Sequence, residues 1–229
     1  MSKPVVYAIA DLHMPGIHDK TMDIFGERWE GHVEKIVVDW QEKVKADDVV
    51  LIPGDISWAM TLDEVQNDLE LLGQLPGKTV LLKGNHDFWW SSISRLRLSL
   101  PDGIYAIQND AIKIGEYIFC GSRGWIYLPE SPEDEKIYKR ELKRLELSLK
   151  SMQRIRENEQ IIALLHFPPT DATGADSAVT SLLENYQVDQ VVYGHLHGQS
   201  AQMAFSGSKN GVVYHFVACD ALDFRLLKL

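Results

Sequence analysis

Short apolar runs recur along the chain, each rich in β-branched residues and bounded by turn residues. They lie at residues 5–10, 49–52, 79–82, 117–120, 161–165, 191–193 and 212–217. Runs of this length and composition are typical of buried strands, so the pattern predicts a strand at each of these places.

Segments in which apolar residues recur at helical spacing separate these runs. They cover residues 29–46, 62–72, 89–98 and 132–158, and the last has one apolar face and a charged remainder. Strands that alternate with helices indicate an α/β protein with a mostly parallel sheet buried on both faces. Short strands with few helices between them, within residues 104–120 and 200–229, indicate a second sheet packed on the first.

Composition narrows the class of protein. The 229 residues allow one large domain over residues 1–229, and 45% hydrophobic with 24% charged residues is ordinary for a globular protein. The formal net charge of −10 argues against a long nucleic acid as partner, because such binding needs a surplus of cations. A small anionic substrate remains compatible with this charge, since metal ions can supply positive charge locally.

Cysteine usage and the N-terminus point to a reducing compartment. The two cysteines, Cys120 and Cys219, form no close pair, so neither a disulfide framework nor a thiolate zinc site is expected. The N-terminal apolar run of six residues is too short for a signal peptide or a membrane span. We therefore expect a cytoplasmic protein with no membrane partner.

Polar clusters follow five of the predicted strands directly. They are Asp11-Leu12-His13, Gly54-Asp55, Gly84-Asn85-His86-Asp87, His166 and Gly194-His195-Leu196-His197. Ligands of open α/β sheets bind at the carboxyl ends of strands, where such clusters can converge. Five of the eight histidines lie in these clusters, a concentration that histidines with scattered structural roles have no reason to show.

The clusters contain the donors of a metal site without sulfur. Two Asp, one Asn and four His are candidate ligands, a mixed nitrogen and oxygen set that suits Mn, Fe, Zn, Co or Ni. They are too many for one four-ligand site. The set fits two divalent or mixed-valence transition metals about 3.5–4 Å apart that share a bridging carboxylate.

In order and composition the five clusters resemble the motifs of the calcineurin-like metallophosphoesterase superfamily. Those motifs run Asp-x-His, Gly-Asp, Gly-Asn-His-Asp/Glu, His and Gly-His-x-His, and every position is matched between residues 11 and 197. The resemblance implies a four-layer α/β/β/α sandwich, in which two mixed β-sheets are flanked by helices, and it implies a single metallophosphoesterase domain.

The resemblance also assigns roles to the cluster residues. It implies that one metal is held by Asp11, His13, Asp55 and His197, and that Asp55 bridges to a second metal held by Asn85, His166 and His195. It implies that a metal-bridging hydroxide attacks phosphorus while His86, which is not a ligand, assists the departing oxygen. The catalytic residues are then Asp55 and His86.

Two departures from relatives within this superfamily narrow the activity. Protein phosphatases have an Asp-Arg pair after Gly-Asp, whereas this chain reads Ile56-Ser57-Trp58-Ala59, which argues against protein phosphatase activity. Purple acid phosphatases have a metal-binding Tyr where this chain has Trp58, which argues against an iron-tyrosinate enzyme.

Aromatic residues and one arginine near the clusters are candidates for substrate binding. Trp58, Phe88 and Trp89, with Trp125 further along, either form an aromatic wall for a flat group or pack the loops. Arg123, between two glycines, is a candidate for gripping a phosphate oxygen. Trp90 is expected to pack.

Other residues have open or minor roles. Asp87 either acts in the chemistry or orients and caps the helix that follows. His18 either lines the cleft or is a solvated loop residue, and His32 in a helix and His215 in a strand receive no role. The helix at 132–158 is a solvated face, a dimer contact or a wall of the cleft, so the oligomeric state stays open.

The function that these observations favour is hydrolysis of a phosphomonoester or phosphodiester, with a small nucleotide or phosphorylated metabolite as substrate. Two alternatives remain: a non-catalytic metal-binding scaffold of the same fold, and a two-metal hydrolase of another ester or of an amide.

Overall fold

In the computed structural model, which describes residues 3–17 and 22–229, the strands form two mixed sheets. The first has the order β11-β1-β2-β3-β4, in which β1 to β4 are parallel and β11 is antiparallel to β1. Its strands are β1 (Val6–Ala8), β2 (Val49–Pro53), β3 (Lys78–Leu82), β4 (Ile104–Ile107) and β11 (Leu227–Lys228).

The second sheet has the order β5-β6-β7-β8-β10-β9. Strands β6, β7, β8 and β10 are parallel, and the edge strands β5 and β9 are antiparallel to their neighbours. Its strands are β5 (Ala111–Ile114), β6 (Tyr117–Ser122), β7 (Gln160–Leu165), β8 (Gln190–Tyr193), β9 (Gly207–Lys209) and β10 (Val212–Phe216).

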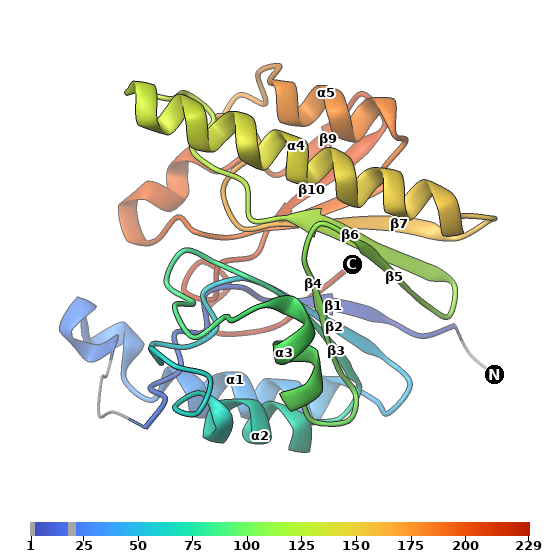
Figure 1. Ribbon diagram of the computed structural model, residues 1–229. Coiled ribbons are helices and arrows are strands. Elements are labelled where there is room, and N and C mark those ends of the chain that lie inside the picture. Colours follow the sequence, from blue (N-terminus) through green and yellow to red (C-terminus); the bar gives the residue numbers. More distant parts are fainter. Residues whose placement is uncertain (1–2, 18–21) are drawn as a thin grey trace.

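Helices cover the outer face of each sheet (Figure 1). The first sheet is covered by α1 (His32–Lys43), α2 (Gln66–Gln74) and α3 (Ile93–Ser99), and the second by α4 (Pro132–Ile155) and α5 (Ala178–Asn185). Short 3₁₀ turns lie at Met22–Phe25, Glu27–Trp29 and Gly198–Met203. The order helix, sheet, sheet, helix confirms the expected four-layer sandwich.

Both faces of the central strands are buried, which explains their continuous apolar runs. In β2, Val50 and Ile52 pack toward Trp40 of α1, while Val49 and Leu51 face the layer between the sheets. A third apolar cluster joins the second sheet to α4, whose Leu145 is 1% exposed.

The strand positions were predicted well, but their assignment to sheets was partly wrong. Residues 104–107 lie in the first sheet and not the second, because α3 carries the chain over to place β4 parallel to β3. Residues 227–228 also return to the first sheet, beside β1. The helix predicted at 89–98 begins only at Ile93, and α5 was not predicted.

None of the helices within residues 3–17 and 22–229 is long and apolar enough to cross a membrane.

Candidate metal centre

Loops from the two sheets meet beyond the carboxyl ends of their parallel strands and bring the predicted ligands together. Asp11, His13 and His197 form one group in which the ligand atoms lie within 4.8 Å of one another. A second group of the same tightness consists of Asp55, His166 and His195.

The two groups are neighbours, and Asp55 touches both. Its Oδ2 lies 3.4 Å from His166 Nε2 and 3.8 Å from His13 Nε2. His166 Nδ1 lies 3.8 Å from Asp11 Oδ1, and the Asn85 carbonyl oxygen lies 2.7 Å from His166 Nε2. The structure therefore gathers all seven predicted ligands, and Asp55 contacts members of both groups.

The backbone of these loops is held in an unusual conformation. Asp11, His13, Asp55 and His195 have φ angles of 62°, 44°, 52° and 76°, in the left-handed region. Each such residue costs about 1–3 kcal/mol and persists only where surrounding contacts enforce it. Their concentration in one cluster indicates a functional site.

Close backbone approach requires glycine beside two of the carboxylates. A Cβ on Gly84 would lie 2.1 Å from Asp55 Oδ1, and a Cβ on Gly194 would lie 2.1 Å from Asp11 Oδ2. No side chain fits at either position, which explains the Gly in the Gly-Asn-His and Gly-His motifs.

Asp87 is buried and holds the loop that carries Asp55. Its carboxylate accepts hydrogen bonds from the backbone N–H groups of Asp55, Ile56 and Gly84 at 2.7–2.9 Å, and from the Trp89 indole at 3.0 Å. Helix α3 begins six residues later, so Asp87 does not cap it. The structure therefore gives Asp87 a positioning role.

Replacing Asp87 with Asn is expected to lower the free energy of unfolding by at least about 2 kcal/mol. Either orientation of the amide turns its N–H₂ toward backbone donors, and each unsatisfied buried donor costs about 1–3 kcal/mol. Urea unfolding of the variant measures this. The exposed Asp63→Asn variant is the control. Equal stability of the two variants would contradict the role of Asp87 in holding the Asp55 loop.

The electrostatics suit metal binding at three of the predicted ligands, His13, His195 and Asp55. Burial lowers the pKa of His13 and of His195 to about 3, so both rings are neutral at pH 7, the form that binds a metal. Burial opposes ionisation of Asp55, but the neighbouring His166 and His13 outweigh it and hold the pKa of Asp55 below its usual range.

Two buried ring nitrogens have no hydrogen-bond partner among the described residues: His13 Nδ1 and His197 Nε2. Buried polar atoms are normally paired, so these orphaned atoms, together with the nitrogen and oxygen donors around them, fit bound cations.

A sequence profile of calcineurin-like phosphoesterases matches residues 4–199. The chain belongs to the calcineurin-like phosphoesterase family. It is therefore a metal-dependent phosphoester hydrolase, and the expectation that it is an enzyme is confirmed.

Solved structures share this fold at low identity. TT1561 of Thermus thermophilus matches with a TM-score of 0.60 at 14% identity, over 100% of this chain and 99% of that one. Phosphopantetheinyl hydrolase of Mycobacterium tuberculosis matches with a TM-score of 0.58 at 15% identity, over 99% of this chain and 96% of that one. A purple acid phosphatase from yellow lupin seeds matches with a TM-score of 0.52 at 16% identity, over 95% of this chain and 44% of that one. No curated protein matches in sequence.

In this phosphoesterase, His86 lies at the edge of the metal centre among aromatic rings. Its ring centroid is 4.8 Å from that of Trp58, 5.7 Å from that of His13 and 6.5 Å from that of Phe88. Its backbone N–H donates to Asp55 Oδ1 at 2.8 Å. Among the described residues no carboxylate bonds to the His86 imidazole, in keeping with the missing Asp-Arg pair.

The aromatic candidates for substrate binding divide into two groups. Trp58 stacks on His13 with ring centroids 4.7 Å apart, and Phe88 is 59% exposed, so both lie near the metal centre and outside the buried core. Trp89 is 1% exposed and belongs to the core, as does Trp90 at 5%. For Trp89 the structure favours the packing alternative, because its indole is occupied by the buried Asp87.

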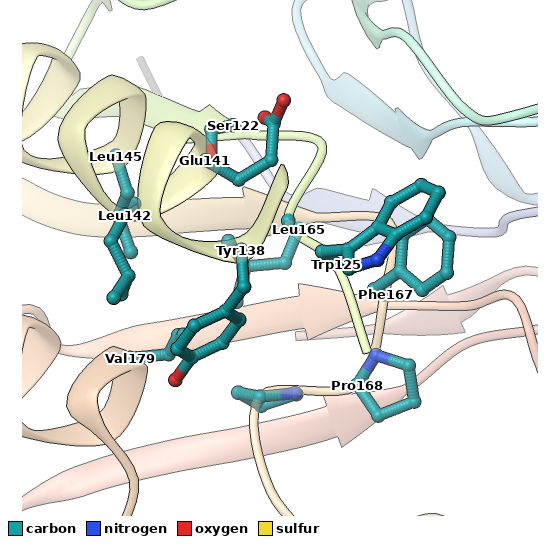
Figure 2. A pocket seen from close by; sticks show the side chains of 12 residues that line it. Ser122, Trp125, Tyr138, Glu141, Leu142, Leu145, Leu165, Phe167, Pro168 and Val179 are labelled. Carbon is teal, nitrogen blue, oxygen red and sulfur yellow. The ribbon is translucent and has the colours of Figure 1, made fainter. Parts of the chain in front are cut away.

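Arg123 and Trp125 lie in the loop after β6, at the side of the metal centre that the second sheet supplies. The Arg123 guanidinium carbon is 5.0 Å from the Trp125 ring centroid, and Trp125 packs on Phe167, whose ring is 4.0 Å from His195. Figure 2 shows Trp125 and Phe167 side by side at an apolar pocket. That pocket holds only about 10 Å³, roughly one water, so it is a packing gap.

Asp220 is a site residue that sequence reasoning missed. Its Oδ1 lies 2.9 Å from His197 Nδ1, and its Oδ2 accepts the Gly198 N–H at 2.9 Å. Burial disfavours charge on His197, but the carboxylates of Asp11 and Asp220 outweigh it and raise the pKa of His197 to about 10. The sequence did carry one signal for Asp220, since it follows the predicted strand at 212–217 as the predicted ligands follow theirs.

Replacing Asp220 with Asn is expected to weaken metal binding about 10–100-fold, because carboxylates behind a ligating His orient its ring and raise its basicity. Competition with a chromogenic chelator measures the metal affinity. The exposed Asp102→Asn variant removes the same charge elsewhere. Unchanged affinity in Asp220→Asn would show that Asp220 does not support a metal ligand.

The remaining histidines have other places. His32 is buried at the start of α1 and bonds to the carbonyls of Trp29 and Leu12, and His215 in β10 bonds to Gln190. His18 lies outside the described residues.

Proposed function

We propose that the chain hydrolyses a small phosphate ester with two metal ions held by the gathered ligands. The observation that carries this proposal is the pair of adjacent ligand groups with Asp55 between them. In this proposal Asp11, His13, Asp55 and His197 hold one ion, and Asp55, Asn85, His166 and His195 hold the other.

The two cations, when bound, supply Lewis acidity that neutralises the phosphoryl oxygens and makes water a stronger acid. The chain contributes the orientation of the ligands. Buried neutral His13 and His195, an ionised Asp55, and glycines that let the loops approach closely hold the donor atoms ready, so little reorganisation is needed during reaction.

In this proposal His86 assists the departure of the leaving oxygen. Its backbone bond to Asp55 places its ring beside the ligand cluster, and Trp58 restrains that ring from one side. Hydrogen bonding or proton donation from the imidazole to the departing oxygen lowers the barrier to bond cleavage. Among the described residues no carboxylate bonds to the ring, which instead lies among the rings of Trp58, His13 and Phe88.

The substrate is proposed to be a small nucleotide or phosphorylated metabolite. Exposed Phe88 and half-buried Trp58 offer an apolar surface to its organic part, and Arg123 offers a guanidinium to a phosphate oxygen. The similar phosphopantetheinyl hydrolase acts, by its name, on a phosphopantetheinyl group, which is an organic group joined to a phosphate.

Hydrolysis of p-nitrophenyl phosphate, bis(p-nitrophenyl) phosphate and p-nitrophenyl acetate by purified protein tests the proposal. We expect turnover of at least one phosphate ester with Mn²⁺, loss of turnover with a chelator, and recovery when Mn²⁺ is returned. The acetate controls for a general esterase. Acetate hydrolysis without phosphate ester hydrolysis in metal-loaded protein would overturn the proposal.

A further inference from the structure

A cavity of about 230 Å³ lies beside the metal centre, and its charged lining is mostly positive. In the described part of the chain four basic side chains and one carboxylate line it: Lys83, Arg123, Arg140, Arg144 and Glu141. The chain as a whole carries a net charge of −10, so this local excess of cations runs against its general composition.

Backbone connections link two residues of the cavity wall to segments that carry predicted metal ligands. Lys83 precedes Asn85 by two residues, a span of at most about 7 Å. The Arg123 carbonyl accepts hydrogen bonds from the backbone N–H groups of His166 and Phe167, both at 3.0 Å. Two lining residues of the cavity are therefore backbone neighbours of the predicted ligands Asn85 and His166.

The one carboxylate in the lining is shared by three guanidinium groups. Glu141 Oε1 lies 2.7 Å from Arg144, 3.6 Å from Arg140 and 3.7 Å from Arg123. Glu141 is 2% exposed, so it is committed to these partners. The lining itself holds one negative charge against three guanidiniums and Lys83, while outside it Asp87 acts on Lys83 and Asp55 acts on Arg123. A bound anion would reduce the repulsion that remains among these like charges.

Buried atoms at the cavity wall also lack partners. Ser122 Oγ, Arg123 Nε and Glu141 Oε2 form no hydrogen bond to any described residue, although buried polar atoms are normally paired. Figure 2 shows Glu141 extending from α4 beside Ser122. Two of these groups, the Ser122 hydroxyl and the Arg123 Nε–H, are donors, but both are buried behind the cavity surface, so the charged ends of the basic side chains are what an anion would meet first. The Glu141 oxygen is an acceptor that suits a water or the hydroxyl of a singly protonated phosphate.

We propose that this cavity binds a second phosphate group of the substrate, so that the enzyme acts on small molecules with two phosphate groups. The proposal rests on the proposed function, because the phosphate that is cleaved must lie at the metal centre. The cavity is smaller than the roughly 300–1,000 Å³ of sites for whole ligands, which suits one group of a larger molecule. Arg123 then binds the second phosphate rather than the scissile one.

A symmetrical bisphosphate tests the proposal without ambiguity about which phosphate is cleaved. With Mn²⁺-loaded protein, kcat/KM is compared for 1,3-propanediol bisphosphate and propyl phosphate. We expect kcat/KM to be at least about tenfold higher for the bisphosphate, because one charge-assisted hydrogen bond to the second phosphate is usually worth a factor of this size. Arg144→Gln is expected to reduce this ratio about tenfold and Arg144→Lys by less.

Arg154→Gln is the matched control, because Arg154 is exposed on the same helix α4. Each ratio is measured on one protein sample, so partial misfolding cancels. Equal ratios in the wild type, Arg154→Gln and Arg144→Gln overturn the second-phosphate subsite while leaving the phosphoesterase proposal intact. Absence of metal-dependent hydrolysis of either ester would instead count against the proposed function.

Binding supplies a readout that does not need catalysis. Propane-1,3-bisphosphonate, whose P–C bonds are not hydrolysed, is titrated calorimetrically into the Mn²⁺-loaded wild type, Arg154→Gln and Arg144→Gln proteins. We expect the dissociation constant to rise about tenfold in Arg144→Gln alone. The same constant in all three proteins, or no preference over propylphosphonate, would overturn the proposal whatever the kinetic result.

Discussion

Replacing Asp55 with Asn is expected to lower kcat/KM for a phosphate ester at least about a thousandfold. Asp55 Oδ2 reaches ligands of both groups, at 3.4 Å from His166 Nε2 and 3.8 Å from His13 Nε2. A metal site contributes several kcal/mol of transition-state stabilisation, and about 1.4 kcal/mol corresponds to a factor of ten. Kinetics with saturating Mn²⁺ measure the loss of kcat/KM, and metal analysis of the purified variant measures the loss of bound metal.

The exposed Asp47→Asn variant controls for the loss of one negative charge. It should retain both activity and metal content. Because Asn is the size of Asp, the variant also keeps the packing under Gly84. Two equivalents of bound metal together with full activity in Asp55→Asn would contradict a bridging role for this residue.

Replacing His86 with Ala is expected to lower kcat about 10²–10⁴-fold without loss of metal, because general acid catalysis contributes on this scale. The ring lies outside both ligand groups, yet within 5.7 Å of His13 between ring centroids. The loss should be larger for propyl phosphate than for p-nitrophenyl phosphate, since a poor leaving group needs protonation and a good one does not.

His215→Ala is the matched control, because His215 lies in β10 and bonds to Gln190, away from the ligand groups. Equal losses for the two esters in His86→Ala would show that His86 positions other groups and does not assist the leaving oxygen. Loss of metal in His86→Ala would place it in the ligand set.

The large elements of the fold were predictable because their patterns are local. The apolar runs that became β2 and β7 and the amphipathic face of α4 are visible in short windows of sequence. Sheet membership was not visible, since the placement of β4 beside β3 depends on how α3 packs. The apolar stretch at Trp89 was mistaken for helix because the Asp87 contacts that hold it form only in the fold.

Among the candidate site residues, the short motifs identified those that the structure gathers. Aromatic residues were harder to interpret, because Phe88 at 59% exposure and Trp89 at 1% are neighbours in sequence. Whether such a side chain faces a substrate or the core depends on the path of a loop, which composition does not encode.

The sequence by itself determined the family through short motifs, and with it the four-layer class that local periodicity also indicated. The donor residues that these motifs name stay a prediction. Only the tertiary structure showed which side chains hold the predicted ligands in place. The Asp220 contact to His197 spans 23 residues, and the bond from the Asp55 N–H to Asp87 spans 32. The cationic cavity joins Lys83 after β3 to Arg144 in α4. Such contacts join distant segments, so they follow from packing and leave no pattern along the chain.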